Sequence, residues 1–133
     1  MAVTARDLAA RLAAEPDWRV PLAEFLDAIY GLWPDGAAMA AALMEPPGVP
    51  LLAFPAALLA ATVEHLAVQW HLPPVPWAAA AGWGLAEPTS LAPAWVPTAR
   101  MRGPPAFQAR RLLADPDPLR RARRPTLPAA EWF

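Results

Sequence analysis

The two histidines are the residues of this chain best suited to acid–base or metal chemistry. His65 and His71 are six positions apart in a segment with helical periodicity. Six residues of helix turn through about 600°, so the two rings do not share a face that could hold a metal ion. Glu64 precedes His65 directly, but neighbours on a helix diverge by about 100° and form no local acid–base dyad. The pattern favours structural roles for both histidines.

Other catalytic chemistries lack their residues. The chain has no Cys and no Lys, which excludes thiolate metal sites, Cys nucleophiles and Schiff-base chemistry. Ser90 is the only serine, and no glycine flanks it in the way a nucleophile elbow requires. Gly82 and Gly84 enclose the bulky Trp83 and follow no strand, so they do not form a phosphate cradle. The sequence therefore predicts a protein that is not an enzyme, with no metal and no cofactor.

Positive charge is concentrated near the C-terminus. Residues 1–99 contain three Arg and nine acidic residues, a balance of −6, whereas residues 100–133 contain eight Arg and three acidic residues, a balance of +5. Three interpretations remain open: the arginines bind nucleic acid, dock on an acidic protein surface, or pair with the acidic N-terminal part of the same chain. The pI near 6.1 is unlike that of a typical DNA-binding domain.

Six of the seven tryptophans divide into two groups. Trp33 and Trp70 lie on apolar helical stripes, so we expect both in the core. The other tryptophans of interest stand in Pro-rich or terminal segments, where contact with a partner is as reasonable an expectation as internal packing. They are Trp77, Trp83, Trp95 and Trp132.

Capping residues and apolar spacing predict two helices near the N-terminus. The first covers residues 5–14, with Thr4 as its cap and Asp7 completing a capping box. The second has Pro21 in its first turn. Its apolar stripe recurs at helical spacing through Leu22, Phe25, Leu26, Ile29, Tyr30 and Trp33.

Two further helices follow. Asp35 can cap an alanine-rich helix that ends near Met44. A fourth helix, over about residues 55–70, is apolar nearly all round, which is typical of a helix at the centre of a bundle.

Prolines become too frequent for long elements after Leu72. We expect short helical turns at residues 76–81 and 91–95, a last helix over residues 105–114, and a turn over residues 118–123. No segment shows the alternation of a strand. The resulting fold class is all-α: a compact helical bundle, an irregular Pro/Trp-rich cover and an Arg-rich C-terminal helical tail.

Length and composition complete this prediction. A chain of 133 residues forms one domain, divided into a helical core (4–72), a Pro/Trp-rich segment (73–104) and an Arg-rich segment (105–133). Prolines interrupt both charge-free runs, so neither predicts a membrane span, and the N-terminus has no signal-peptide pattern. We expect a cytoplasmic protein. The 33 Ala and 19 Pro, without Lys, indicate a GC-rich genome and suit a thermophile.

Several motifs, in this order along residues 20–122, resemble a family of small helical proteins from GC-rich bacteria. The segments are 21–30 (PLAEFLDAIY), 43–47 (LMEPP), 60–67 (AATVEHLA), 72–77 (LPPVPW), 104–110 (PPAFQAR) and 119–122 (LRRA). Two departures concern the last part. Gln108 and Ala109 separate Phe107 from the Arg run, and residues 112–114 read as helix where the family tends to have a strand-like step.

Members of this family are typically encoded beside nucleotidyltransferase-like proteins, in pairs that look like toxin–antitoxin modules. The resemblance implies a non-catalytic, antitoxin-like protein that covers the active site of such a partner. A nucleic-acid-binding or regulatory protein that uses the same arginines is the alternative. The residues expected to contact the partner are Trp77, Trp95, Phe107, Arg110, Arg111, Arg120 and Arg121.

Overall fold

Local capping and proline positions fix the first two helices as the sequence predicts. The computed structural model describes residues 3–80, 84–92, 103–122 and 124–125. Helix α1 (Ala5–Ala14) begins with a capping box: Asp7 N–H donates to Thr4 Oγ1 over 3.2 Å, and Thr4 N–H donates to the Asp7 carboxylate over 2.9 Å. Helix α2 (Arg19–Tyr30) contains Pro21 in its first turn. Both predicted helices are confirmed.

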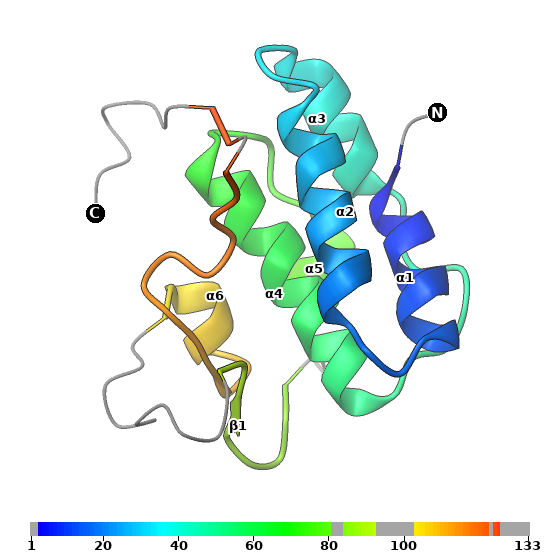
Figure 1. Ribbon diagram of the computed structural model, residues 1–133, viewed down its shortest axis with the longest axis vertical. Coiled ribbons are helices and arrows are strands. Elements are labelled where there is room, and N and C mark those ends of the chain that lie inside the picture. Colours follow the sequence, from blue (N-terminus) through cyan, green and yellow to red (C-terminus); the bar gives the residue numbers. More distant parts are fainter. Residues whose placement is uncertain (1–2, 81–83, 93–102, 123, 126–133) are drawn as a thin grey trace.

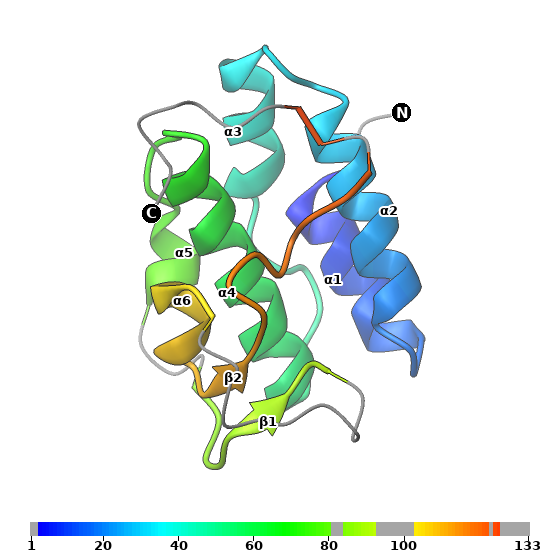
Figure 2. The same ribbon diagram turned by 60° about the vertical axis from the view of Figure 1, so that its left-hand side comes forward.

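Helices α3 (Gly36–Met44) and α4 (Ala53–Gln69) are also confirmed. Asp35 caps α3 by accepting the Ala38 N–H over 3.0 Å. Helix α4 is buried along almost its whole length and contacts α1 together with two short helices, α5 (Pro76–Ala79) and α6 (Pro105–Gln108). Figures 1 and 2 show it in the middle of the molecule. Its apolar circumference follows from this central position.

The two helical-stripe tryptophans differ in burial. Trp70 is 4% exposed, as expected for a core residue. Trp33 is 39% exposed, so its predicted core position is wrong. Since α2 ends at Tyr30, Trp33 lies beyond the regular helix, where the helical spacing no longer sets its direction. It packs on the edge of the core instead, with its ring centroid 5.0 Å from that of Trp70.

The predicted helix over residues 105–114 is wrong after its first turn. Helix α6 ends at Gln108, Arg111 has a φ of 61°, and Leu112–Leu113 form strand β2. This strand pairs in parallel with β1 (Thr89–Ser90), although the sequence indicated no strands. The left-handed conformation of Arg111 turns the chain away from the helix axis. Pairing with β1 then outweighs the local helical preference of residues 109–114.

The chain after β2 forms no helix either, so the predicted helical tail is wrong in the described residues. In Figure 2 the orange-to-red segment runs between α2 and α4. Leu119 is buried there, and its carbonyl oxygen accepts the Tyr30 hydroxyl proton over 2.7 Å. Asp117 binds Arg124 through both carboxylate oxygens, over 2.6 and 2.8 Å.

The structure is thus a compact all-α fold with one very small parallel sheet in its described part. The turn expected at residues 91–95 lies outside the described residues from position 93 onward. Among the described helices, none combines the length and hydropathy needed to cross a membrane.

Candidate functional site

Arg110 is the most deeply buried arginine of the described chain. Its side chain is 8% exposed and donates from Nη1 to Glu64 Oε1 over 2.8 Å. The same guanidinium donates to the carbonyl oxygens of Ala106 (2.8 Å) and Ala78 (2.6 Å). One cation therefore ties together α4, the end of α5 and α6. In this fold Arg110 forms internal bonds and is not part of the surface.

Two more arginines also pair with acidic residues of the chain. Arg121 binds both carboxylate oxygens of Asp27 on α2, over 3.0 and 2.9 Å, and both side chains are 38% exposed. Arg124 binds Asp117. The hydrogen bonds that both guanidinium groups donate to these carboxylates raise their pKa values. Of the three interpretations of the basic segment, pairing with the acidic N-terminal part therefore describes Arg110 and Arg121, whereas Arg124 pairs within the C-terminal segment.

Arg111 and Arg120 are the two predicted contact arginines that stay exposed. Neither forms an ion pair with a described residue. The Arg111 guanidinium donates to the Ala86 carbonyl oxygen, and its backbone carbonyl accepts the Thr89 N–H over 2.9 Å. The positive φ of this non-glycine residue is a conformation of low population that the surrounding structure must stabilise. Arg111 is therefore held in place while its charge faces solvent.

The predicted aromatic contacts are less accessible. Phe107 is fully buried and packs edge-on against His65, with ring centroids 6.0 Å apart. Trp77 is partly buried, and its indole N–H donates to the Leu43 carbonyl oxygen over 3.1 Å. Trp95 lies outside the described residues. Phe107 cannot contact a partner unless the fold rearranges.

The histidines do not meet. His65 is 3% exposed, and burial lowers its pKa from 6.5 to about 4, which keeps the imidazole neutral at physiological pH. His71 follows α4, is exposed and has a φ of 55°.

Ser90 Oγ accepts the Ala92 N–H over 3.1 Å. Within the described ranges, no three His, Asp or Glu side chains are grouped as metal ligands.

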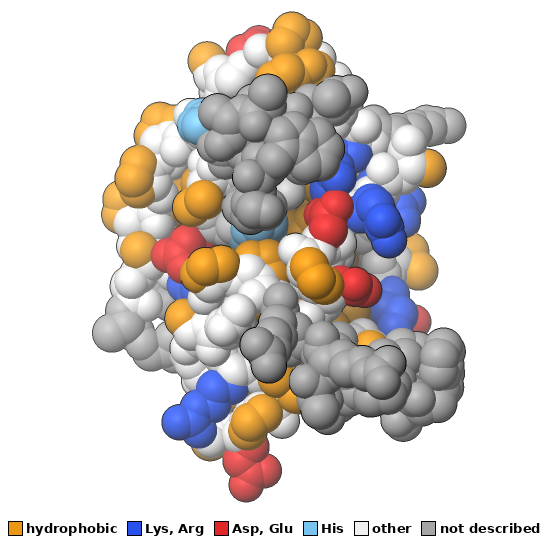
Figure 3. All heavy atoms as spheres, turned by 90° about the vertical axis from the view of Figure 1, so that its left-hand side faces the viewer, with side chains coloured by type: hydrophobic (Ala, Val, Ile, Leu, Met, Phe, Trp, Pro, Cys, Tyr) orange, Lys and Arg blue, Asp and Glu red, His pale blue; other side chains and the backbone are white. Residues whose placement is uncertain are grey.

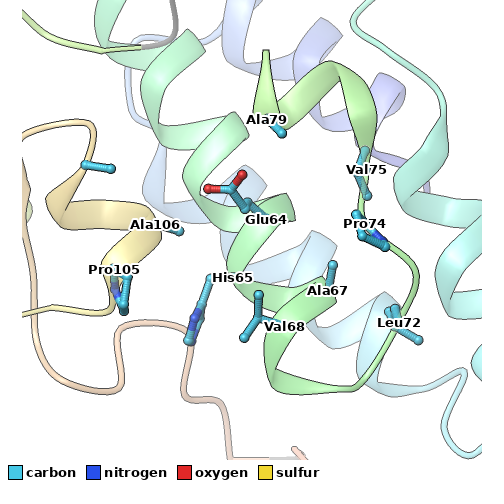
Figure 4. A pocket seen from close by; sticks show the side chains of 11 residues that line it. Glu64, His65, Ala67, Val68, Leu72, Pro74, Val75, Ala79, Pro105 and Ala106 are labelled. Carbon is cyan, nitrogen blue, oxygen red and sulfur yellow. The ribbon is translucent and has the colours of Figure 1, made fainter. Parts of the chain in front are cut away.

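Sequence reasoning missed a pocket between α4, α5 and α6. Its volume is about 430 Å³, and Figure 4 shows the Glu64 carboxylate between α6 on one side and α5 on the other. The complete lining is Glu64, His65, Ala67, Val68, Leu72, Pro74, Val75, Ala79, Pro105, Ala106 and Ala109. The only signal in the sequence is Glu64, an acidic residue in an apolar helix. Its partner Arg110 is 46 positions away, so spacing cannot reveal the pair.

Charges of both signs mix on the side of the molecule that carries α6 and the C-terminal segment. Figure 3 shows blue arginine and red acidic side chains next to one another there, with orange apolar side chains between them. The described part of this face presents no basic patch of the kind that tracks a phosphate backbone.

We compared the chain with protein-family models, curated proteins and solved structures, and found no match in any of the three. The family resemblance of the motifs therefore stays a prediction.

Proposed function

We propose that this chain is a non-catalytic, antitoxin-like protein that binds a nucleotidyltransferase-like partner and covers its active site. The order of motifs across residues 20–122 suggests the class of partner. The observation that carries the proposal is the exposure of Arg111 and Arg120, which have no carboxylate partner among the described residues. Nucleotidyltransferase-like active sites hold metal through carboxylates, and arginine forks bind carboxylates well.

The two arginines differ from the paired ones in what binding would cost. Arg121 would have to release Asp27 before it could bind another carboxylate. Arg111 and Arg120 have no ion pair of the described chain to break. Arg111 is also fixed by its bond to the Ala86 carbonyl oxygen, which reduces the side-chain entropy lost on binding. We therefore assign the main contacts with the partner to Arg111 and Arg120, with Trp77 shaping the contact surface.

The test is a binding titration between the purified chain and the product of the neighbouring gene, which the motif resemblance predicts to be nucleotidyltransferase-like. We expect Arg111→Glu combined with Arg120→Glu to weaken binding by about 10- to 100-fold, because both charges would then repel the acidic site. The control is Arg6→Glu combined with Arg19→Glu, the same charge change at exposed positions of α1 and α2. In Figure 1 these helices lie on the side away from α6.

Two results would overturn the proposal: no binding by the unaltered chain, or equal weakening by the test and control pairs. A parallel titration with duplex DNA and single-stranded RNA at low salt examines the alternative. Affinity that falls steeply with salt, without affinity for the protein partner, would favour nucleic-acid binding instead.

A further inference from the structure

The pocket beside α4 has the size and shape of a small-molecule site. Its volume of about 430 Å³ lies in the range of ligand pockets in proteins. The space exists because small side chains line it: four of the lining residues are alanines, Ala67, Ala79, Ala106 and Ala109. Val68 on α4, although apolar, is 60% exposed. An apolar molecule would bury these surfaces together.

The walls of this pocket are fixed before any ligand arrives. Arg110 holds Glu64 of α4, the carbonyl of Ala78 in α5 and the carbonyl of Ala106 in α6 through three hydrogen bonds of 2.6–2.8 Å. These three helices are the ones that enclose the space (Figure 4). A site whose walls are already ordered loses little conformational entropy when it binds. The burial of Arg110 therefore serves the pocket as well as the fold.

Glu64 is the charged residue of the lining, and only one of its two carboxylate oxygens accepts a hydrogen bond from a described residue. Its Oε1 accepts from Arg110, while Oε2 accepts no hydrogen bond from a described residue, and the side chain is 32% exposed. A carboxylate can accept further hydrogen bonds at its second oxygen. The remaining polar ring, His65, is uncharged near neutral pH because burial lowers its pKa to about 4. The lining thus combines an apolar body with the Oε2 acceptor of Glu64.

We propose that this pocket binds a small molecule with an apolar body and one N–H or O–H donor, which bonds to Glu64 Oε2. A ligand with a carboxylate in place of the donor would bring two negative charges together and leave Oε2 without a partner. The proposal concerns a different surface from Arg111 and Arg120, so it stands or falls independently of the protein partner.

Three probes of similar shape test the chemistry: cyclohexylmethylamine, cyclohexylmethanol and cyclohexanecarboxylate. The full chain, labelled at Ala and Val methyl groups, is titrated with each while NMR shifts are followed. We expect the methyl signals of Ala67, Val68 and Ala106 to move, and the amine and alcohol to bind about tenfold more tightly than the carboxylate. Tighter binding of the amine than of the alcohol would identify a cationic ligand, and equal binding a neutral one.

Variants locate the site. Ala109→Trp fills the pocket from its exposed edge and should reduce the affinity for the amine at least about tenfold, whereas Ala41→Trp, at an exposed position on α3, should leave it unchanged. Ala79→Leu is a second filling variant, used if Ala109→Trp unfolds by circular dichroism. Glu64→Gln should abolish the preference for the amine over the carboxylate. Equal affinities for all three probes, no shift at these methyl groups, or unchanged binding by a folded filling variant would overturn the proposal.

Discussion

The helical half of the molecule, residues 3–72, and the C-terminal region, residues 103–122 and 124–125, use polar side chains differently. In the helical half most bonds are local: Thr4 with Asp7, Arg11 with Glu15 and Arg19 with Asp17 lie two to four positions apart. In the C-terminal region, Arg110 and Arg121 reach acidic residues 46 and 94 positions away. The first kind of bond defines helix ends, and the second holds the tertiary fold together.

This difference determines which contacts each half needs in order to be stable. A helix with its own caps and an apolar face needs only a neighbour to pack on. The C-terminal region has one helical turn and a two-residue strand, so it depends on side chains that insert into the helical half. Phe107, Leu112 and Leu119, all less than 2% exposed, do this.

Phe107→Ala should have the largest effect. The ring is fully buried against His65, and its removal leaves a cavity that costs about 3–5 kcal/mol of unfolding free energy. Phe25→Ala on α2, where the ring is 1% exposed, is the matched change in the helical half. Urea denaturation of both variants measures the comparison. Costs within about 1 kcal/mol of each other are expected, and a much smaller cost for Phe107→Ala would mean that the C-terminal region is not part of the core.

The same contrast explains what could be predicted from the sequence. The four long helices follow from local signals: Thr4 with Asp7, Asp35, and prolines in the first turns of α2 and α4. The helix end at Gln108 could not be predicted, because it depends on pairing between Leu112 and Thr89, 23 positions earlier. The pocket could not be predicted for the same reason.

Arg110→Met should follow in size. The substitution leaves the carbonyl oxygens of Ala78 and Ala106 without their donor and Glu64 without its cation, which together cost about 3 kcal/mol. Arg11→Met removes a cation that pairs with Glu15 and Glu24 on the surface, and should cost much less, because exposed ion pairs contribute little to stability. Thermal and urea unfolding give both values. Equal losses of unfolding free energy would mean that the long-range contacts of Arg110 stabilise the fold no more than the surface ion pairs of Arg11 do.

His65 should make the stability of the molecule depend on acid pH. In the folded state its pKa is about 4, whereas in the unfolded chain it is near 6.5. Between these values the unfolded state binds more protons than the folded state. The contribution of His65 to the free energy of unfolding is therefore fully present above pH 6.5 and is lost as the pH falls towards 4. The shift from 6.5 to about 4 corresponds to a loss of about 3 kcal/mol.

The measurement is urea unfolding at pH 7.0, 5.5 and 4.5. His65→Gln should reduce the slope of stability against pH over this interval, whatever its effect on stability at pH 7.0. Asp117 and Arg124 act on His65 with opposite signs and change its pKa less than burial does. A slope that survives in His65→Gln would assign the pH dependence to other groups.

Tyr30→Phe should have the smallest effect on the free energy of unfolding. Compared with Thr4→Ala, it tests whether each half responds to the loss of its own hydrogen bond. The ring packs on Trp70 in either residue, so the change removes the hydroxyl group with its bond to the Leu119 carbonyl oxygen and its interaction with Arg124, together worth about 1 kcal/mol. Thr4→Ala removes the cap of α1 at a similar cost. The two variants should then accelerate amide hydrogen exchange in different regions. Tyr30→Phe accelerates it at residues 119–122, and Thr4→Ala accelerates it in the first turn of α1. Faster exchange throughout the chain in Tyr30→Phe would mean that the C-terminal region cannot open without unfolding the helices beneath it.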